Sequence, residues 1–327
     1  MSKPYITLEK DPYFKELIIG FEDPCIIKKK YGDLWDKEEI KKEKRLLNIQ
    51  SNFIYHPLPL NDDPNEIEFY APFFLTLHHL LDNDFQTNHE LFQKYQYSWI
   101  LQGAKALSDI HSNKLYHGRL SDESFYVDEK LIIRIGNIGY GTDEYSAKTH
   151  QYYMPPEGFA SDFNINKLQL FYQQQYDVYS FGIIMLNILT LQCNEDSLYD
   201  KPDIRLEKKD YKPFKKIVDS QLKELNSNEP EFTKIIRLCL DKDPNKRIKS
   251  DLLFKDIHKI IEGDKEDHYA INSLSVVSQP INVFEAMKII PQNFPIKIQI
   301  VKELYESCTY EDVLQVVISH PKLIEIL

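Results

Sequence analysis

The segment from Val178 to Thr190, with the sequence VYSFGIIMLNILT, is apolar almost all the way around a helix. A surface helix has one apolar and one polar face, so this pattern predicts a helix buried in the middle of a domain. Such a helix needs many packing partners. The chain can supply them, because 327 residues with 42% hydrophobic and 13% aromatic side chains support a sizeable core and exclude a disordered protein.

The overall charge argues against polyanionic partners. Lys and Arg number 40 against 51 Asp and Glu, which gives a formal net charge of -11. Bulk attraction to nucleic acid or to anionic lipid is therefore not expected. No apolar run approaches the roughly 18 residues that span a bilayer, and the first residues contain no apolar signal segment, so no membrane contact is expected.

The cysteines point to a reducing compartment. The chain contains four, far apart and with no Cys-x-x-Cys pair, so the spacing predicts neither a zinc knuckle nor a disulfide framework. We expect a cytoplasmic protein, with a nuclear location left open. The cysteines are Cys25, Cys193, Cys239 and Cys308.

Strand-like composition dominates the first part of the chain. Short apolar runs at residues 17–19 and 25–27, split by a turn, predict two strands within residues 14–30. Residues 66–75 return to strand composition. Between them, residues 36–48 place apolar side chains among charges at helical spacing, which predicts a helix.

Helices dominate beyond Leu77. Residues 98–111 carry an apolar face at helical spacing and predict a long helix. Residues 125–127 and 131–135 predict two short strands around a polar turn. A strand-rich half followed by a helix-rich half predicts an α+β protein with two lobes.

Several short motifs, in this order, resemble those of a protein kinase domain, and the resemblance covers roughly residues 14–262. They resemble the catalytic loop, the metal-binding turn, the end of the activation segment, the central helix and the closing Arg motif. The resemblance implies a small β-rich N-lobe (1–76) and a larger helical C-lobe (77–262), and we expect a helical C-terminal extension (263–327) to follow them. The motifs are YHGRLSDESFYV (116–127), IGNIG (135–139), YMPPE (153–157), DVYSFG (177–182) and CLDKDPNKR (239–247).

The resemblance also implies that the catalytic chemistry is lost. Kinases use H-R-D-x-x-x-x-N, in which the Asp is the catalytic base and the Asn holds a magnesium ion. The aligned residues here are His117, Arg119 and Ser124. A guanidinium accepts no proton, and losing a general base alone costs roughly 10²- to 10⁴-fold in rate. Asn137 replaces the D-F-G Asp, so no charged metal ligand remains.

Nucleotide binding is expected to be weak for the same reason. Gly20 is the only glycine available for the glycine-rich phosphate loop, and Ile26 fills a position where kinases have a small Ala beside the adenine ring. Lys28 and Glu43 resemble the phosphate-pairing Lys and its Glu partner, although a plain ion pair that sets the position of a helix explains them more simply. We expect no cofactor.

The residues that support the fold in the kinase pattern, as opposed to those that carry out catalysis, are present in this sequence. By the resemblance, Glu157 and Arg247 form the buried ion pair that anchors the activation segment, and Asp177 accepts backbone N–H bonds from the catalytic loop. His117 is expected to pack in the column of side chains between the lobes, beside Ile138 and Leu47. His78 and His79 are interpreted as surface or packing residues.

The stretch that resembles the activation segment is rich in tyrosine. Tyr140, Tyr145, Tyr152 and Tyr153 raise the hypothesis of a phosphorylation switch. The simpler interpretation is that they have no such role, because Gly118 replaces the Arg that usually receives the phosphate. Arg119 could supply a substitute cation.

The tail lies outside the resemblance. Residues 296–305 and 309–318 predict two short helices with apolar faces, the second opened by a capping pair, Thr309 and Asp312. These faces either dock on the large lobe, which we favour, or present a site for a partner.

Together these observations predict a pseudokinase that acts as a protein-binding scaffold or allosteric regulator in signalling. One alternative is a divergent ATP- and Mg-dependent protein kinase, for Ser/Thr or Tyr, or a nucleotidyl transferase, with replacement acids such as Asp122, Glu123 or Asp143. A second alternative is a purely structural domain whose tail docks a larger complex. Protein partners are expected under the favoured interpretation.

Overall fold

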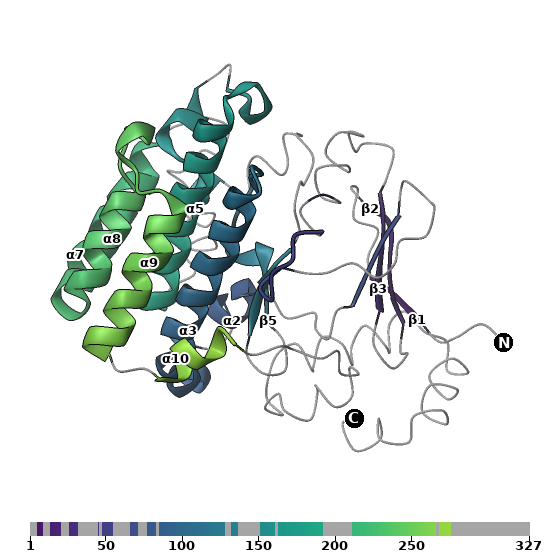
Figure 1. Ribbon diagram of the computed structural model, residues 1–327, viewed down its shortest axis with the longest axis horizontal. Helices are drawn as coiled ribbons and strands as arrows, with labels where there is room; N and C mark the ends of the chain where they lie inside the picture. Colours follow the sequence, from purple (N-terminus) through teal and green to yellow (C-terminus); the bar gives the residue numbers. More distant parts are fainter. Residues whose placement is uncertain are drawn as a thin grey trace.

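The described segments of this computed structural model form a four-stranded sheet and a larger helical part. Figure 1 shows the sheet on one side of the molecule and the helices on the other. The helical part contains the hydrophobic core. The structure describes residues 5–8, 14–20, 26–31, 45, 48–54, 66–70, 77–82, 85–127, 132–136, 151–160, 163–191, 211–265 and 268–275.

The four-stranded sheet is antiparallel and follows chain order, with each strand paired to the next. The two strands expected within residues 14–30 are confirmed, and the strand expected at 66–75 is confirmed over its first half, since residues 71–75 lie outside the described residues. The first strand was not predicted, because four residues are too short for a recognisable alternation. The strands are β1 (Tyr5–Leu8), β2 (Phe14–Gly20), β3 (Ile26–Tyr31) and β4 (Glu66–Tyr70).

The long helix α3 (Phe85–Ser112) follows the short α2 (Leu77–Asp82). The helix predicted over residues 98–111 is confirmed, and it begins well before that range. The apolar face is strongest in the second half, where Trp99, Leu107 and Ile110 are fully buried. The sequence pattern detects that half only, because the earlier turns are less apolar.

The buried central helix is confirmed as α5 (Leu170–Thr190). Its residues from Val178 to Ile188 are all buried, and it contacts α3, α7 and α8. Gly182 allows the close approach of α8, because a Cβ at this position would lie 2.7 Å from the Cβ of Cys239. The remaining helices of this part are α7 (Lys212–Asn228), α8 (Pro230–Cys239) and α9 (Ser250–Ile260).

The predicted hairpin is confirmed as β5 (Phe125–Val127) and β6 (Ile133–Ile135). The N–H of Ile135 donates to the carbonyl of Phe53 at 2.8 Å, so the 48–54 segment lies along β6. Most of the helix predicted over 36–48 lies outside the described residues. The described residues 48–54 form no helix, and Asn48, Asn52 and Phe53 lie in turns.

The final described helix, α10 (His268–Ser273), packs against α3. Ala270 is fully buried, and the hydroxyls of Ser98 and Ser273 lie 3.0 Å apart. The start of the expected C-terminal extension therefore contacts the helical part. A π-helical turn, η6 (Ile261–Lys265), leads into it from α9.

The described loops between these elements contain short 3-10 turns, which are η1 (Asp122–Ser124), η2 (Gln151–Tyr153), η3 (Pro156–Phe159), η4 (Ile165–Lys167) and η5 (Pro244–Lys246). Residues 296–318, with both predicted tail helices, lie outside the described residues. Among the helices that the structure describes, none combines the length and apolar character needed to cross a membrane.

Candidate functional site

The loop after α3 is held in place by one buried carboxylate from α5. The backbone N–H of His117 donates to Asp177 Oδ2 at 2.6 Å, and that of Gly118 donates to Asp177 Oδ1 at 2.7 Å. His111, in the last turn of α3, places its Nε2 3.1 Å from Asp177 Oδ2. Asp177 therefore fixes both the loop and the end of the preceding helix.

Gly118 gives this loop its shape. Its φ is +88°, in the left-handed region that side chains other than glycine seldom occupy. In this conformation consecutive N–H groups point at the two oxygens of the same carboxylate. Gly118 thus allows the backbone conformation in which the N–H groups of His117 and Gly118 both reach Asp177.

The surroundings of Asp177 favour its charged form. Burial acts to raise the pKa of this carboxyl, but the hydrogen bond and charge of His111, together with the Gly118 N–H, outweigh burial and lower the pKa below its ordinary value. Ionised Asp177 is consequently part of the folded state at neutral pH.

Stability is expected to depend on the ionisation of Asp177. Because its pKa is lowered on folding, its contribution is complete above the ordinary carboxyl pKa and is lost as the pH falls through the lower folded value. Urea unfolding from pH 7 to pH 3 should therefore show the wild type losing its advantage over Asp177→Asn as the pH falls. An advantage that stays constant over this range would contradict this role.

His117 connects the loop to the hairpin. It is fully buried, its Nε2 lies 3.1 Å from the carbonyl oxygen of Gly136, and its Nδ1 accepts the N–H of Arg119 at 3.3 Å. This arrangement requires the proton on Nε2. Its expected neighbours Ile138 and Leu47 lie outside the described residues.

Arg119 occupies the next loop position and is half-buried. Burial raises the pKa of the Tyr176 phenol, and the positive charge of Arg119 partly opposes this rise. The guanidinium of Arg119 therefore lies within electrostatic range of α5. The side chain at this loop position is therefore a cation that cannot accept a proton.

Ser124 is buried at the end of η1 and its hydroxyl is used inside the loop. The hydroxyl accepts the N–H of Ser121 at 3.1 Å and donates to the carbonyl oxygen of Arg119 at 3.2 Å. The carbonyl of Ser124 accepts the N–H of Gly136 at 2.9 Å. Ser124 therefore braces the loop against β6.

His78 and Asp122 form a contact that the sequence did not indicate. Nδ1 of His78, in α2, lies 3.4 Å from Oδ2 of Asp122. The Asp122 side chain is fully buried and that of His78 is 18% exposed. His78 is thus a half-buried partner of Asp122, and no local pattern signals a partner 44 positions away. The side chain of His79 lies outside the described residues.

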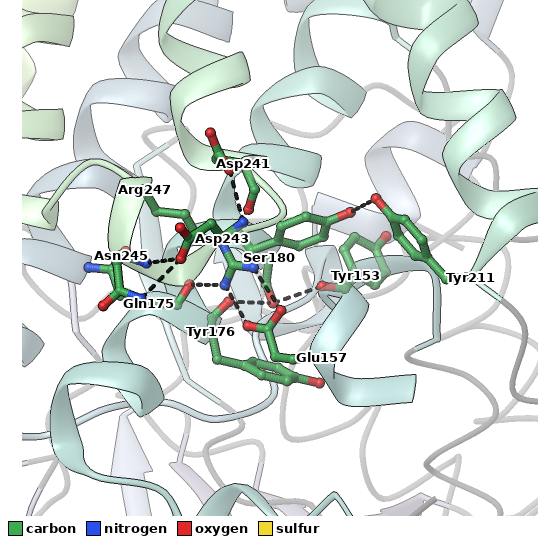
Figure 2. Close-up of polar contacts among 11 residues, drawn as sticks. Tyr153, Glu157, Gln175, Tyr176, Ser180, Tyr211, Asp241, Asp243, Asn245 and Arg247 are labelled. Atoms are coloured by element: carbon green, nitrogen blue, oxygen red, sulfur yellow. Dashed lines mark hydrogen bonds and ion pairs between the residues drawn. The ribbon is translucent and has the colours of Figure 1, made fainter. Parts of the chain in front are cut away.

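Glu157 and Arg247 are brought together as a two-pronged ion pair, shown in Figure 2. Nη1 of Arg247 donates to Glu157 Oε1 at 2.6 Å, and Nη2 donates to Oε2 at 2.8 Å. The pair joins η3 to the segment between α8 and α9, 90 residues apart in the sequence. Parallel N–H bonds of this kind are among the strongest side-chain contacts in proteins.

Two more donors of Arg247 are also engaged. Nε donates to the carbonyl of Asp241 at 2.8 Å, and Nη1 donates to that of Gln175 at 3.1 Å. The guanidinium also lies 5.1 Å from the ring centre of Tyr179, within range of a cation–π contact. Arg247 thus joins η3, α5 and the loop after α8 (Figure 2).

The order of these segments along the chain matches the sequence pattern of a known protein family. A sequence profile of the protein kinase domain matches residues 26–258. The chain belongs to the protein kinase family. The match covers the loop at His117, the η3 segment and Arg247 in one continuous range.

Individual relatives match over shorter stretches. Guanylyl cyclase C of Cavia porcellus is 29% identical over 163 residues, which is 47% of this chain and 14% of that protein. Guanylyl cyclase C of Mus musculus is 28% identical over 152 residues, 44% of this chain and 13% of that protein. Wall-associated receptor kinase-like 3 of Arabidopsis thaliana is 24% identical over 185 residues, 50% of this chain and 24% of that protein. The chain therefore matches less than a quarter of these relatives' length.

The described residues of this kinase domain do not fit a magnesium ion. The hydroxyl of Ser124 is committed to the loop, because it accepts the N–H of Ser121 and donates to the backbone carbonyl of Arg119. No group of three or more His, Cys, Asp or Glu side chains within the described part of the chain is arranged to hold a metal. Asn137 and Glu43 lie outside the described residues, and so does the side chain of Lys28, whose backbone pairs with Glu68 in β4.

The end of the segment that resembles an activation segment is locked into the core. Tyr152 and Tyr153 are 2% and 1% exposed. The hydroxyl of Tyr152 lies 3.2 Å from Asn187 Oδ1 and 3.0 Å from Gln221 Oε1. The hypothesis of phosphorylation is therefore wrong for these two tyrosines in the folded state. Tyr140 and Tyr145 lie outside the described residues.

Proposed function

We propose that this kinase domain transfers no phosphate and acts by binding other proteins, as a scaffold or allosteric regulator. The observation that carries the proposal is Arg119 in a fully anchored loop. Asp177 and His117 hold the backbone on either side of Gly118, so the loop retains a defined shape while presenting a cation. The scattered cysteines favour a cytosolic or nuclear setting for such binding.

The chemistry that remains is too weak for efficient transfer. Phosphoryl transfer needs a positioned γ-phosphate, metal ions that neutralise it and a residue that accepts or orients the hydroxyl proton. Arg119 cannot accept a proton, and the Ser124 hydroxyl is held by Ser121 and the Arg119 carbonyl. Loss of the base alone accounts for roughly 10²- to 10⁴-fold, and the loss of a metal ligand adds to it.

The guanylyl cyclase C relatives support a role other than phosphate transfer. Guanylyl cyclase C is named for a cyclase activity, and the stretch similar to this chain is 14% of the protein from Cavia porcellus. A kinase-like region thus accompanies a differently named activity in that protein. We infer that a kinase-like domain in this chain can likewise regulate through binding.

The rival interpretation is a divergent kinase or nucleotidyl transferase with replacement acids. Asp122 is fully buried beside His78, on the inner side of η1, where a substrate has no access. Glu123 is half-exposed, and Asp143 lies outside the described residues. The burial of Asp122 favours the binding role over this rival.

The test is a phosphotransfer assay on the purified full chain with radiolabelled ATP and either Mg²⁺ or Mn²⁺. We expect no incorporation above a protein-free blank, into the chain itself or into generic Ser/Thr and Tyr substrates, because base and metal ligands are replaced together. An active kinase in parallel reactions serves as the positive control. Stoichiometric incorporation that Lys28→Ala abolishes would refute the proposal.

Nucleotide binding provides a second readout of the same proposal. We expect ATP to bind with a Kd no lower than about 1 mM, which corresponds to a binding free energy of about 4 kcal/mol. At a concentration equal to this Kd, ATP stabilises the fold by only about 0.4 kcal/mol. We therefore expect no thermal shift at 1 mM ATP, with or without Mg²⁺. A micromolar, Mg²⁺-enhanced Kd by calorimetry would instead favour the divergent enzyme.

A further inference from the structure

Two leucines interrupt the polar surface of the helical part. Leu238 in α8 and Leu252 in α9 are each 47% exposed, the most exposed large apolar side chains among the residues that the structure describes. Single exposed leucines are common and need no explanation. Leu238 lies in the last turn of α8 and Leu252 in the first turn of α9.

The backbone brings the two leucines to that common end. The N–H of Ile248 donates to the carbonyl of Leu238 at 3.3 Å, so the segment entering α9 lies against the end of α8. Leu252 lies four residues after Ile248, in the first turn of α9. Leu238 in the last turn of α8 and Leu252 in the first turn of α9 therefore lie at the same end of the α8–α9 pair, and both are exposed to solvent.

Basic residues lie close in the sequence to both leucines. Lys234 lies one turn before Leu238, and Lys249 and Lys255 lie one turn on either side of Leu252. All three are exposed, as is Arg237. The exposed acids in the same turns are Glu231, Asp251 and Asp256; Glu231 pairs with Lys234 and Asp251 pairs with Lys255, and such exposed pairs carry little energetic weight. We define the α8–α9 patch as Lys234, Arg237, Leu238, Lys249, Leu252 and Lys255.

We propose that residues 303–318 of this same chain dock on the α8–α9 patch. This stretch contains four acidic residues and no Lys or Arg, so its charge is opposite to that of the patch. Its second half predicts a helix with a strongly apolar face, which the two leucines can cover. The acids are Glu303, Glu306, Glu311 and Asp312, and the apolar residues include Leu304, Val313, Leu314, Val316 and Val317.

The connection is long enough for this contact. Residues 276–302 separate the last described residue from the docking stretch, and an extended chain advances about 3.3 Å per residue. The longest described helix, α3, has 28 residues and rises only about 1.5 Å per residue. The linker therefore reaches past the full length of the helical part.

Hydrogen exchange on the full chain tests the proposal. We expect amides of residues 309–318 to exchange at least about tenfold faster when Leu238→Asp and Leu252→Asp are combined, because the docked face is lost. Asn226→Asp with Ser227→Asp, exposed on α7, adds the same charge elsewhere and should leave exchange unchanged. Buried amides of α3 report that each variant is folded. Full exchange of residues 309–318 at the rate of an unstructured peptide in the wild type would overturn the proposal.

Charge swapping and crosslinking distinguish docking of residues 303–318 of the same chain from docking of a second copy. Lys234→Glu with Lys255→Glu should accelerate exchange, and adding Glu311→Lys with Asp312→Lys should restore it to within about twofold. A short bismaleimide should join Leu252→Cys to the native Cys308 within one chain, whereas Ser227→Cys should not react with it. Crosslinks found only between two chains would identify a second copy as the occupant and overturn the proposal, as would failure of the charge swap to restore protection.

Discussion

Replacing Arg247 with alanine is expected to lower the free energy of unfolding by about 3–5 kcal/mol. Arg247 is 4% exposed and holds both oxygens of Glu157, so its removal leaves a carboxylate without its counterion in a partly buried setting. The carbonyls of Asp241 and Gln175 lose donors as well. The loss should appear as a lower midpoint in urea unfolding with an unchanged slope.

Two other arginines provide matched controls for this prediction. Arg237→Ala removes an exposed arginine from α8 and should change stability by less than about 0.5 kcal/mol. Arg119→Ala should also leave the melt nearly unchanged, because the loop is held by backbone bonds to Asp177. If Arg119→Ala were the more damaging substitution, the assignment of the two arginines to their roles would have to be reversed.

The elements that could be predicted are those whose signal is local. The apolar run of α5 shows its burial directly, and the β5–β6 hairpin has two short apolar runs around a polar turn. The kinase resemblance predicted that Glu157 and Arg247 pair and that Asp177 holds the loop. The structure brings each of these groups together. The aligned motifs supplied the long-range pairing that periodicity alone cannot give.

The contacts that were missed depend on residues far apart in the sequence. Tyr97 in α3 stacks on Phe232 with ring centres 5.4 Å apart, and its hydroxyl donates to Glu229 at 2.6 Å. His78 meets Asp122, and Tyr152 reaches Gln221, by similar tertiary placement. Each side chain alone has several plausible roles in the sequence. Only packing selects one, because tertiary context overrides local preference.

Replacing Asp177 with alanine is expected to destabilise the fold by more than about 4 kcal/mol. Asp177 is fully buried and accepts hydrogen bonds from the N–H groups of His117 and Gly118 and from His111. A buried donor left without its acceptor costs about 1–3 kcal/mol, and here three donors lose the same carboxylate. Since whole domains are stable by only about 5–15 kcal/mol, the variant should be marginally folded.

A graded series of variants shows whether this cost comes from the hydrogen bonds. Asp177→Asn keeps one oxygen acceptor and should lose roughly half as much stability as Asp177→Ala, whereas Asp219→Ala, exposed on α7, should change little. In both Asp177 variants the amides of His117 and Gly118 should exchange faster, because they are the groups that lose an acceptor. If Asp177→Ala melted like Asp219→Ala and these amides stayed protected, the carboxylate would not be the anchor of the loop, and the argument that the loop keeps its shape while presenting Arg119 would fail with it.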